Sequence, residues 1–133
     1  MFLNRLTLLE KETFISLGVR AAEANGIIVE EEYLALEEYC KEMGIAFFDV
    51  RNLRDMEYIV SVFSKSEKSH KRIVLLELLG LMHIDKSYDE QEKEFVEKFA
   101  NNIGLDSSEV SAQEKLIKKY LELIREISSE IEK

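Results

Sequence analysis

Apolar side chains recur at helical spacing along almost the whole chain. Within residues 7–24, Phe14, Leu17, Ala21 and Ala24 follow one another at intervals of three or four residues, the pattern of a helix that buries one face. The same pattern predicts further helices over residues 29–43, 55–63, 64–83, 89–104 and 107–131. No segment alternates with a period of two over a useful length. We therefore predict no sheet and an all-α fold of six to seven helices.

The chain nearly repeats itself 60 residues further on. The segment from Ala24 to Glu32 is echoed by the segment from Ile84 to Glu92. Each copy has the pattern of a helix, a short acidic knee, a second helix and a glycine stop. We therefore predict a single domain over residues 1–133, built from two pseudo-symmetric halves. The halves span about 7–50 and 67–110, and the C-terminal helix spans about 107–131.

Helix starts carry capping sequences. Residues 7–10 and 64–67 have the Ser/Thr-x-x-Glu form of a capping box, and Asp55, Asp89 and Asp106 stand where N-cap residues belong. The side-chain oxygens of these residues are expected to accept hydrogen bonds from the backbone amides that have no partner at the beginning of a helix.

One predicted helix is apolar nearly all round. Residues 73–82 hold two polar or small exceptions, Glu77 and Gly80, and such a segment is typical of a helix surrounded by others. Gly80 costs about 1 kcal/mol relative to Ala inside a helix. We therefore expect it at a close helix crossing.

Composition agrees with a helical domain in a reducing setting. The 133 residues are 46% hydrophobic and 34% charged and include no proline, the residue that interrupts helices. Cys40 is the only cysteine and lies on an apolar stripe, where a buried, inert thiol is expected. The first residues lack the pattern of a signal peptide, and no apolar stretch approaches the roughly 18 residues of a membrane span. A cytoplasmic location is the prediction.

The net charge of −9 is concentrated in the two knees and the helices after them. Residues 21–42 hold seven acidic and one basic side chain, and residues 81–102 hold six acidic and three basic ones. The rest of the chain is balanced. This distribution disfavours nucleic acid and anionic lipid, and it favours cations or basic protein partners.

Glu32 and Glu92 occupy equivalent places at the knees, on the line of a buried stripe. Because an unpaired buried carboxylate is costly, we expect each to bind amides at its own helix start and fix the angle between two helices. The predicted structural knees consist of Asn25, Gly26 and Glu32 in the first copy and of Asp85 and Glu92 in the second.

A functional alternative uses the same groups. Asp85, Asp89 and Glu92 could converge on a divalent cation through oxygen ligands, although Glu90 stands where an EF-hand loop has glycine. His83 could join Asp85 and Glu92 at a transition metal; the other interpretation is a partly buried, hydrogen-bonded histidine. No other cofactor is predicted.

At the knees the chain resembles the tellurite-resistance TerB-like family. The family carries a small-residue helix end, an Asp-Gly turn, an apolar residue and a Glu opening the next helix, often twice. Residues 22–28 with Glu32 and residues 82–89 with Glu92 follow this order, with Asn25 in place of the first Asp and Lys86 in place of the second Gly. The resemblance, which covers residues 14–110, implies an all-helical pseudo-symmetric fold, a cytoplasmic setting and a stress-response or binding role. Metal sensing and membrane-associated scaffolding have been proposed for the family, and its acidic cluster is the suspected ligand site.

No catalytic residue is predicted. The single Glu67-x-x-His70 falls short of the two copies that di-iron bundles need, and His70 is expected at a solvated helix start. The sequence therefore favours a non-enzymatic binding or stress-response module that meets a divalent cation or a basic protein segment. Two alternatives remain. One is a metal-dependent hydrolase or oxidase using Asp85, Asp89, Glu92 and His83. The other is a structural homodimer built on the apolar stripe of the last helix, which includes Ile127 and Ile131.

Overall fold

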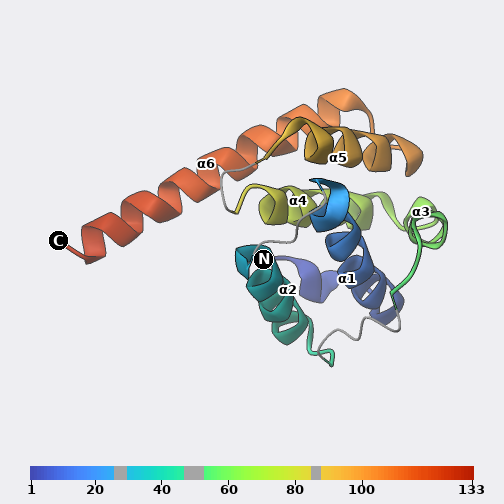
Figure 1. Ribbon diagram of the computed structural model, residues 1–133, viewed down its shortest axis with the longest axis horizontal. Coiled ribbons are helices and arrows are strands. Elements are labelled where there is room, and N and C mark those ends of the chain that lie inside the picture. Colours follow the sequence, from blue (N-terminus) through green and yellow to red (C-terminus); the bar gives the residue numbers. More distant parts are fainter. Residues whose placement is uncertain (26–29, 47–52, 85–87) are drawn as a thin grey trace.

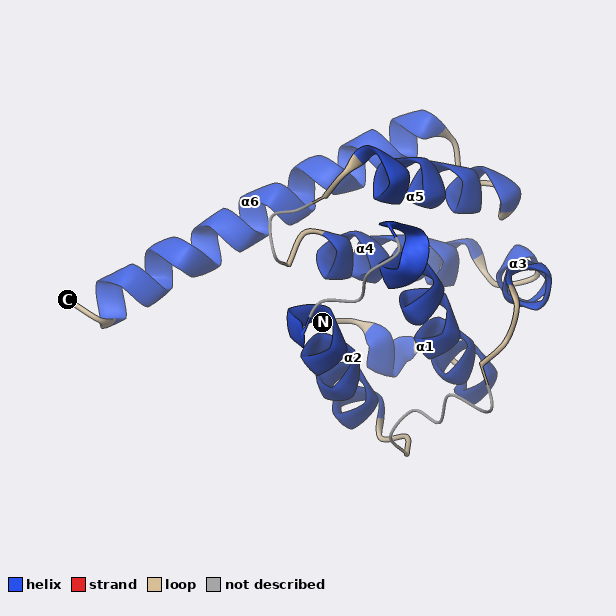
Figure 2. Cartoon of the chain, viewed as in Figure 1, coloured by secondary structure: helices blue, strands red, loops and turns tan. Residues whose placement is uncertain are grey.

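The computed structural model describes residues 1–25, 30–46, 53–84 and 88–133, and these residues form six α-helices and two short 3-10 helices (Figure 1). No strand occurs among the described residues (Figure 2), so the all-α prediction is confirmed. The helices are η1 (Leu3–Arg5), α1 (Leu8–Ala22), η2 (Glu23–Asn25), α2 (Glu30–Met43), α3 (Met56–Ser64), α4 (Lys68–Met82), α5 (Glu90–Asn102) and α6 (Ser107–Ile131).

The sequence repeat reappears in the helix boundaries. Helices α1 and α4 each contain 15 residues and begin at Leu8 and Lys68, while α2 and α5 begin at Glu30 and Glu90. After α2 and α5 the chain passes through Gly44 (φ +69°) and Gly104 (φ +95°), a left-handed conformation that favours glycine. Each of these pairs is separated by 60 positions. The two halves therefore share one order of elements.

Four of the five predicted N-caps are present, those at Thr7, Asp55, Asp89 and Asp106. The Thr7 hydroxyl accepts from the Glu10 amide at 3.2 Å, and Oε1 of Glu10 accepts from the Thr7 amide at 2.8 Å, which completes the capping box of α1. Asp55 and Asp106 each accept an amide hydrogen bond of 2.9 Å at the starts of α3 and α6. These side chains satisfy amides that a helix start leaves free.

The predicted cap at residues 64–67 is wrong. Ser64 is the last residue of α3, and α4 begins at Lys68 without a side-chain cap from its N-cap residue, Glu67. The Ser66 hydroxyl donates to the Val62 carbonyl at 3.5 Å. The capping-box sequence therefore falls on the turn that closes α3, because local spacing does not reveal where the preceding helix ends.

Helix α4 is central, as its apolar sequence predicts. It contacts η1, α1, α2, α5 and α6 and buries Ile73, Val74, Leu75, Leu78, Leu79, Leu81 and Met82. Its Glu77 is also buried, at 2% exposure. The Glu77 carboxylate accepts from the Phe2 amide at 2.8 Å and pairs with the Met1 ammonium at 2.9 Å, so the charge is compensated.

Gly18, and not the predicted Gly80, lies at a tight contact between helices. A Cβ atom added to Gly18 in α1 would lie 2.5 Å from Cδ2 of Leu36 and 3.2 Å from Cδ2 of Leu81. The same atom added to Gly80 would lie 3.7 Å from Cδ1 of Ile117, an ordinary contact. Gly18 therefore allows α1, α2 and α4 to approach.

Candidate functional site

The second acidic knee supplies the cap of α5. Oδ1 of Asp89 accepts from the Glu92 amide at 2.9 Å, and Oε1 of Glu92 accepts from the Asp89 amide at 3.2 Å. Glu92 is 2% exposed and lies on the face of α5 that also buries Val96 and Phe99. Both carboxylates therefore act on the backbone of their own helix start. Asp85, the third predicted ligand, lies outside the described residues.

The first knee is described only at its two ends. Asn25 ends η2, Gly26 lies outside the described residues, and Glu32 stands in the first turn of α2. Glu32 is 2% exposed, the same as its repeat equivalent Glu92. The two knee glutamates thus share a buried position.

Within residues 1–25, 30–46, 53–84 and 88–133, no group of three or more His, Cys, Asp or Glu side chains is placed to hold a metal ion. The predicted cation site at Asp85, Asp89 and Glu92 includes a residue outside these ranges and stays a prediction. Cys40 is buried, as expected.

His83 connects α4 to α6. Its Nδ1 donates to the Leu79 carbonyl at 2.8 Å, its Nε2 lies 3.5 Å from Oε1 of Glu114, and its ring lies 4.2 Å from the ring of Tyr88. The expected partly buried, hydrogen-bonded histidine is therefore present. Burial, together with nearby carboxylates led by Glu114, raises the pKa of Tyr88. A cavity of about 520 Å³ opens beside both rings and is bordered by Arg125.

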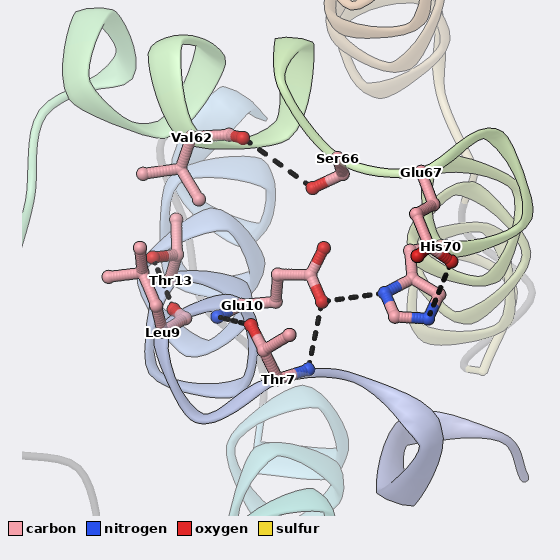
Figure 3. Close-up of polar contacts among 8 residues, drawn as sticks. All are labelled: Thr7, Leu9, Glu10, Thr13, Val62, Ser66, Glu67 and His70. Atoms are coloured by element: carbon pink, nitrogen blue, oxygen red, sulfur yellow. Dashed lines mark hydrogen bonds and ion pairs between the residues drawn. The ribbon is translucent and has the colours of Figure 1, made fainter.

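A second polar cluster joins α1 to α4 (Figure 3). Nδ1 of His70 donates to Oε1 of Glu10 at 2.8 Å, and the two side chains are 17% and 7% exposed. The predicted solvated position of His70 is wrong. Its neighbours in the sequence are charged, but the start of α4 packs near the start of α1, a long-range contact that helical spacing does not reveal.

The cluster holds Glu10 as an anion. Burial raises the pKa of Glu10, but the nearby Ser66 hydroxyl, the hydrogen bond from the Thr7 amide and His70 outweigh burial and hold the pKa below its ordinary value of 4.5. The other ring nitrogen, Nε2 of His70, lies 3.8 Å from Oε2 of the exposed Glu67. The arrangement orients the imidazole and ties two helix starts together.

The apolar stripe of α6 is covered only in its first half. Val110 and Ile117 are buried, at 2% and 1% exposure, where α6 contacts α4 and α5. Beyond Ile117 the stripe continues, but α6 runs past the other helices and ends away from them (Figure 1). Its exposed members are Tyr120 (41%), Leu123 (53%), Ile124 (42%), Ile127 (46%) and Ile131 (78%). We call the side formed by Tyr120, Ile124, Ile127 and Ile131 the distal face.

Comparison of the chain with protein-family models, with curated proteins and with solved structures found no match. The TerB-like assignment therefore stays a prediction from the knee sequences. No helix of the described residues is long and apolar enough to cross a membrane.

Proposed function

We propose that this chain is a non-enzymatic helical binding module, and that the distal face of α6 binds a helix of a protein partner. The observation that carries the proposal is the continuation of a buried stripe into solvent. Val110 and Ile117 use the stripe to pack α6 on its own domain, and the same spacing then presents large apolar side chains that are 41% to 78% exposed. Exposed apolar surface of this kind marks interaction sites.

The length of the uncovered segment supports the proposal. Most helical stability in proteins comes from packing an apolar face, and isolated helices shorter than about 12–15 residues are marginal in water. The segment after Ile117 has this length, and within it Leu121 is the apolar residue packed against the core. A helix seated on the distal face would supply the missing packing.

The predicted roles of the acidic knees form the second part of the proposal. A divalent cation or a basic segment would meet the carboxylates near Asp89, whose side chain already binds the α5 start. The stress-response role and cytoplasmic setting implied by the TerB-like resemblance are proposed on the same basis, the repeated knees. They are independent of the distal face.

Site-specific photocrosslinking in the native cells tests the distal face. A photoreactive amino acid placed at Ile124 or Ile127 should give one discrete adduct. The matched positions Glu122 and Ser129, on the opposite side of α6, should give none. Equal adducts from both sides, or none from either, would overturn the proposal.

A further inference from the structure

Resting on the proposed function, we infer that the occupant of the distal face is the same face of a second copy of this chain, packed antiparallel. The spacing of the stripe, the distribution of charge along α6 and the composition of its polar side support this antiparallel pairing.

The stripe of α6 has coiled-coil spacing. Val110, Ile117, Ile124 and Ile131 recur every seven residues, and Tyr120 and Ile127 stand three residues after the second and third of them. These are the a and d positions of a heptad pattern, in which apolar side chains insert between those of a facing helix. The a and d positions from Tyr120 onward are the uncovered ones.

An antiparallel register fills every uncovered position. If Ile124 faces Ile127 of the second copy, then Tyr120 faces Ile131 of the second copy, and the two-fold relation repeats both contacts. A two-fold interface uses the same patch on both subunits. This register forms four layers of side chains. Each a or d residue of the distal face lies opposite a d or a residue of the other copy's distal face.

Charge along α6 favours the antiparallel direction. Residues 118–125, which face residues 126–133 in this register, hold three basic side chains and one acidic one, a net +2, whereas residues 126–133 hold one basic and three acidic ones, a net −2. Antiparallel packing places the basic half of one copy beside the acidic half of the other. Parallel packing places like charges together, which is unfavourable.

The charges of α6 also favour a second copy over other occupants of the distal face. Residues 115–133 hold five basic and four acidic side chains, so the chain's net charge of −9 does not oppose self-association through this segment. A basic partner would be drawn to the acidic knees instead. An anionic membrane surface is disfavoured because helices that lie on it have Lys- and Arg-rich polar faces, and the polar side of α6 carries both signs.

Sedimentation equilibrium of the full chain tests whether the partner is a second copy. The mass should rise from 15.5 kDa toward twice that value over a micromolar concentration range. Ile124→Lys/Ile127→Lys should weaken the dimer at least ~100-fold, because two charges would be buried without partners. The control Glu122→Gln/Ser129→Lys adds the same charge on the opposite side and should leave the dimer intact. Circular dichroism of both variants shows whether the helices remain.

Disulfide cross-linking tests whether the two α6 helices pack antiparallel. In a Cys40→Ala background, a mixture of Tyr120→Cys and Ile131→Cys chains should cross-link between the two variants. Either variant alone should cross-link poorly, because identical positions lie about 16 Å apart along the antiparallel helices. Cross-linking of each variant with itself would overturn the antiparallel arrangement.

The two proposals fail in different ways. A chain that stays monomeric at every concentration overturns the second copy as partner. If photocrosslinking from Ile124 then gives an adduct with another protein, the distal face remains a binding surface. If it gives no face-specific adduct, the proposed function fails as well.

Discussion

Glu10 and His70 occupy the same place in the two repeats and contact each other. Each is the third residue of its helix, and Oε1 of Glu10 lies 2.8 Å from Nδ1 of His70. Equivalent residues of two copies meet when the copies are related about an axis that passes between them, as at a two-fold interface. The contact therefore ties the halves together at their first helices, and one half supplies a carboxylate while the other supplies an imidazole.

The Glu10–His70 contact should appear as an energetic coupling. Glu10→Ala and His70→Ala should each destabilise the fold, and a double-mutant cycle should give a coupling of about 1–3 kcal/mol, because the buried partner left behind is unsatisfied. Urea unfolding of the four proteins measures this. The matched control is Glu12→Ala, whose exposed side chain should not couple to His70. A coupling near zero would show that the contact has no energetic role.

Stability should fall at acid pH through Glu10. The pKa of Glu10 is lowered in the folded state, so its contribution is present above the ordinary value of 4.5 and is lost as pH falls through the folded pKa. Glu10→Gln should be less stable than the wild type by about 2 kcal/mol near neutral pH. The difference should shrink below pH 4.5. Urea midpoints measured across this range check the sign, and a constant difference would contradict it.

Local sequence predicted the helices well, and long-range packing limited the prediction of the site. The caps at Thr7, Asp55 and Asp106 depend on neighbouring residues, and the apolar sequence of α4 depends on burial all round, so both could be recognised. The Glu10–His70 contact joins residues far apart in the chain, and either residue alone resembles a surface residue. The stripe of α6 predicted an apolar face but not which half the domain itself covers.

Glu92 should stabilise α5 whether or not a metal is added. Glu92→Ala removes the acceptor of the Asp89 amide and should lower the free energy of unfolding by about 1–2 kcal/mol. Thermal unfolding in the presence of a chelator measures the loss. The control Glu94→Ala alters an exposed position of the same helix and should have little effect. An unchanged melting temperature for Glu92→Ala would contradict the capping role.

A thermal-shift series with Ca²⁺, Mg²⁺, Mn²⁺ and Zn²⁺ tests the predicted cation site separately. A site at the second knee should give saturable stabilisation of the wild type, because a ligand bound to the folded state raises its stability. The stabilisation should be absent in Asp89→Ala. A flat response across the four metals would remove both the cation role and the metal-dependent enzyme.

Substitution by alanine should change the stability of the fold in opposite directions at Gly80 and Gly18, two glycines inside helices. Gly80→Ala adds a Cβ atom in ordinary contact with Ile117, so the gain in helix propensity should stabilise the fold by up to about 1 kcal/mol. Gly18→Ala gains the same propensity, but its Cβ atom would lie 2.5 Å from Leu36, which is itself buried. Overpacking a core costs about 1–3 kcal/mol, so Gly18→Ala should be net destabilising.

Urea midpoints at constant slope compare the two glycine variants directly, because an unchanged slope means that the change lies in stability alone. Equal stabilisation by both alanines would show that Leu36 rotates away from the added atom and that the crossing at Gly18 is not tight. Destabilisation by Gly18→Ala alone, relieved when Leu36→Val shortens the opposing side chain, would locate the cost at that contact.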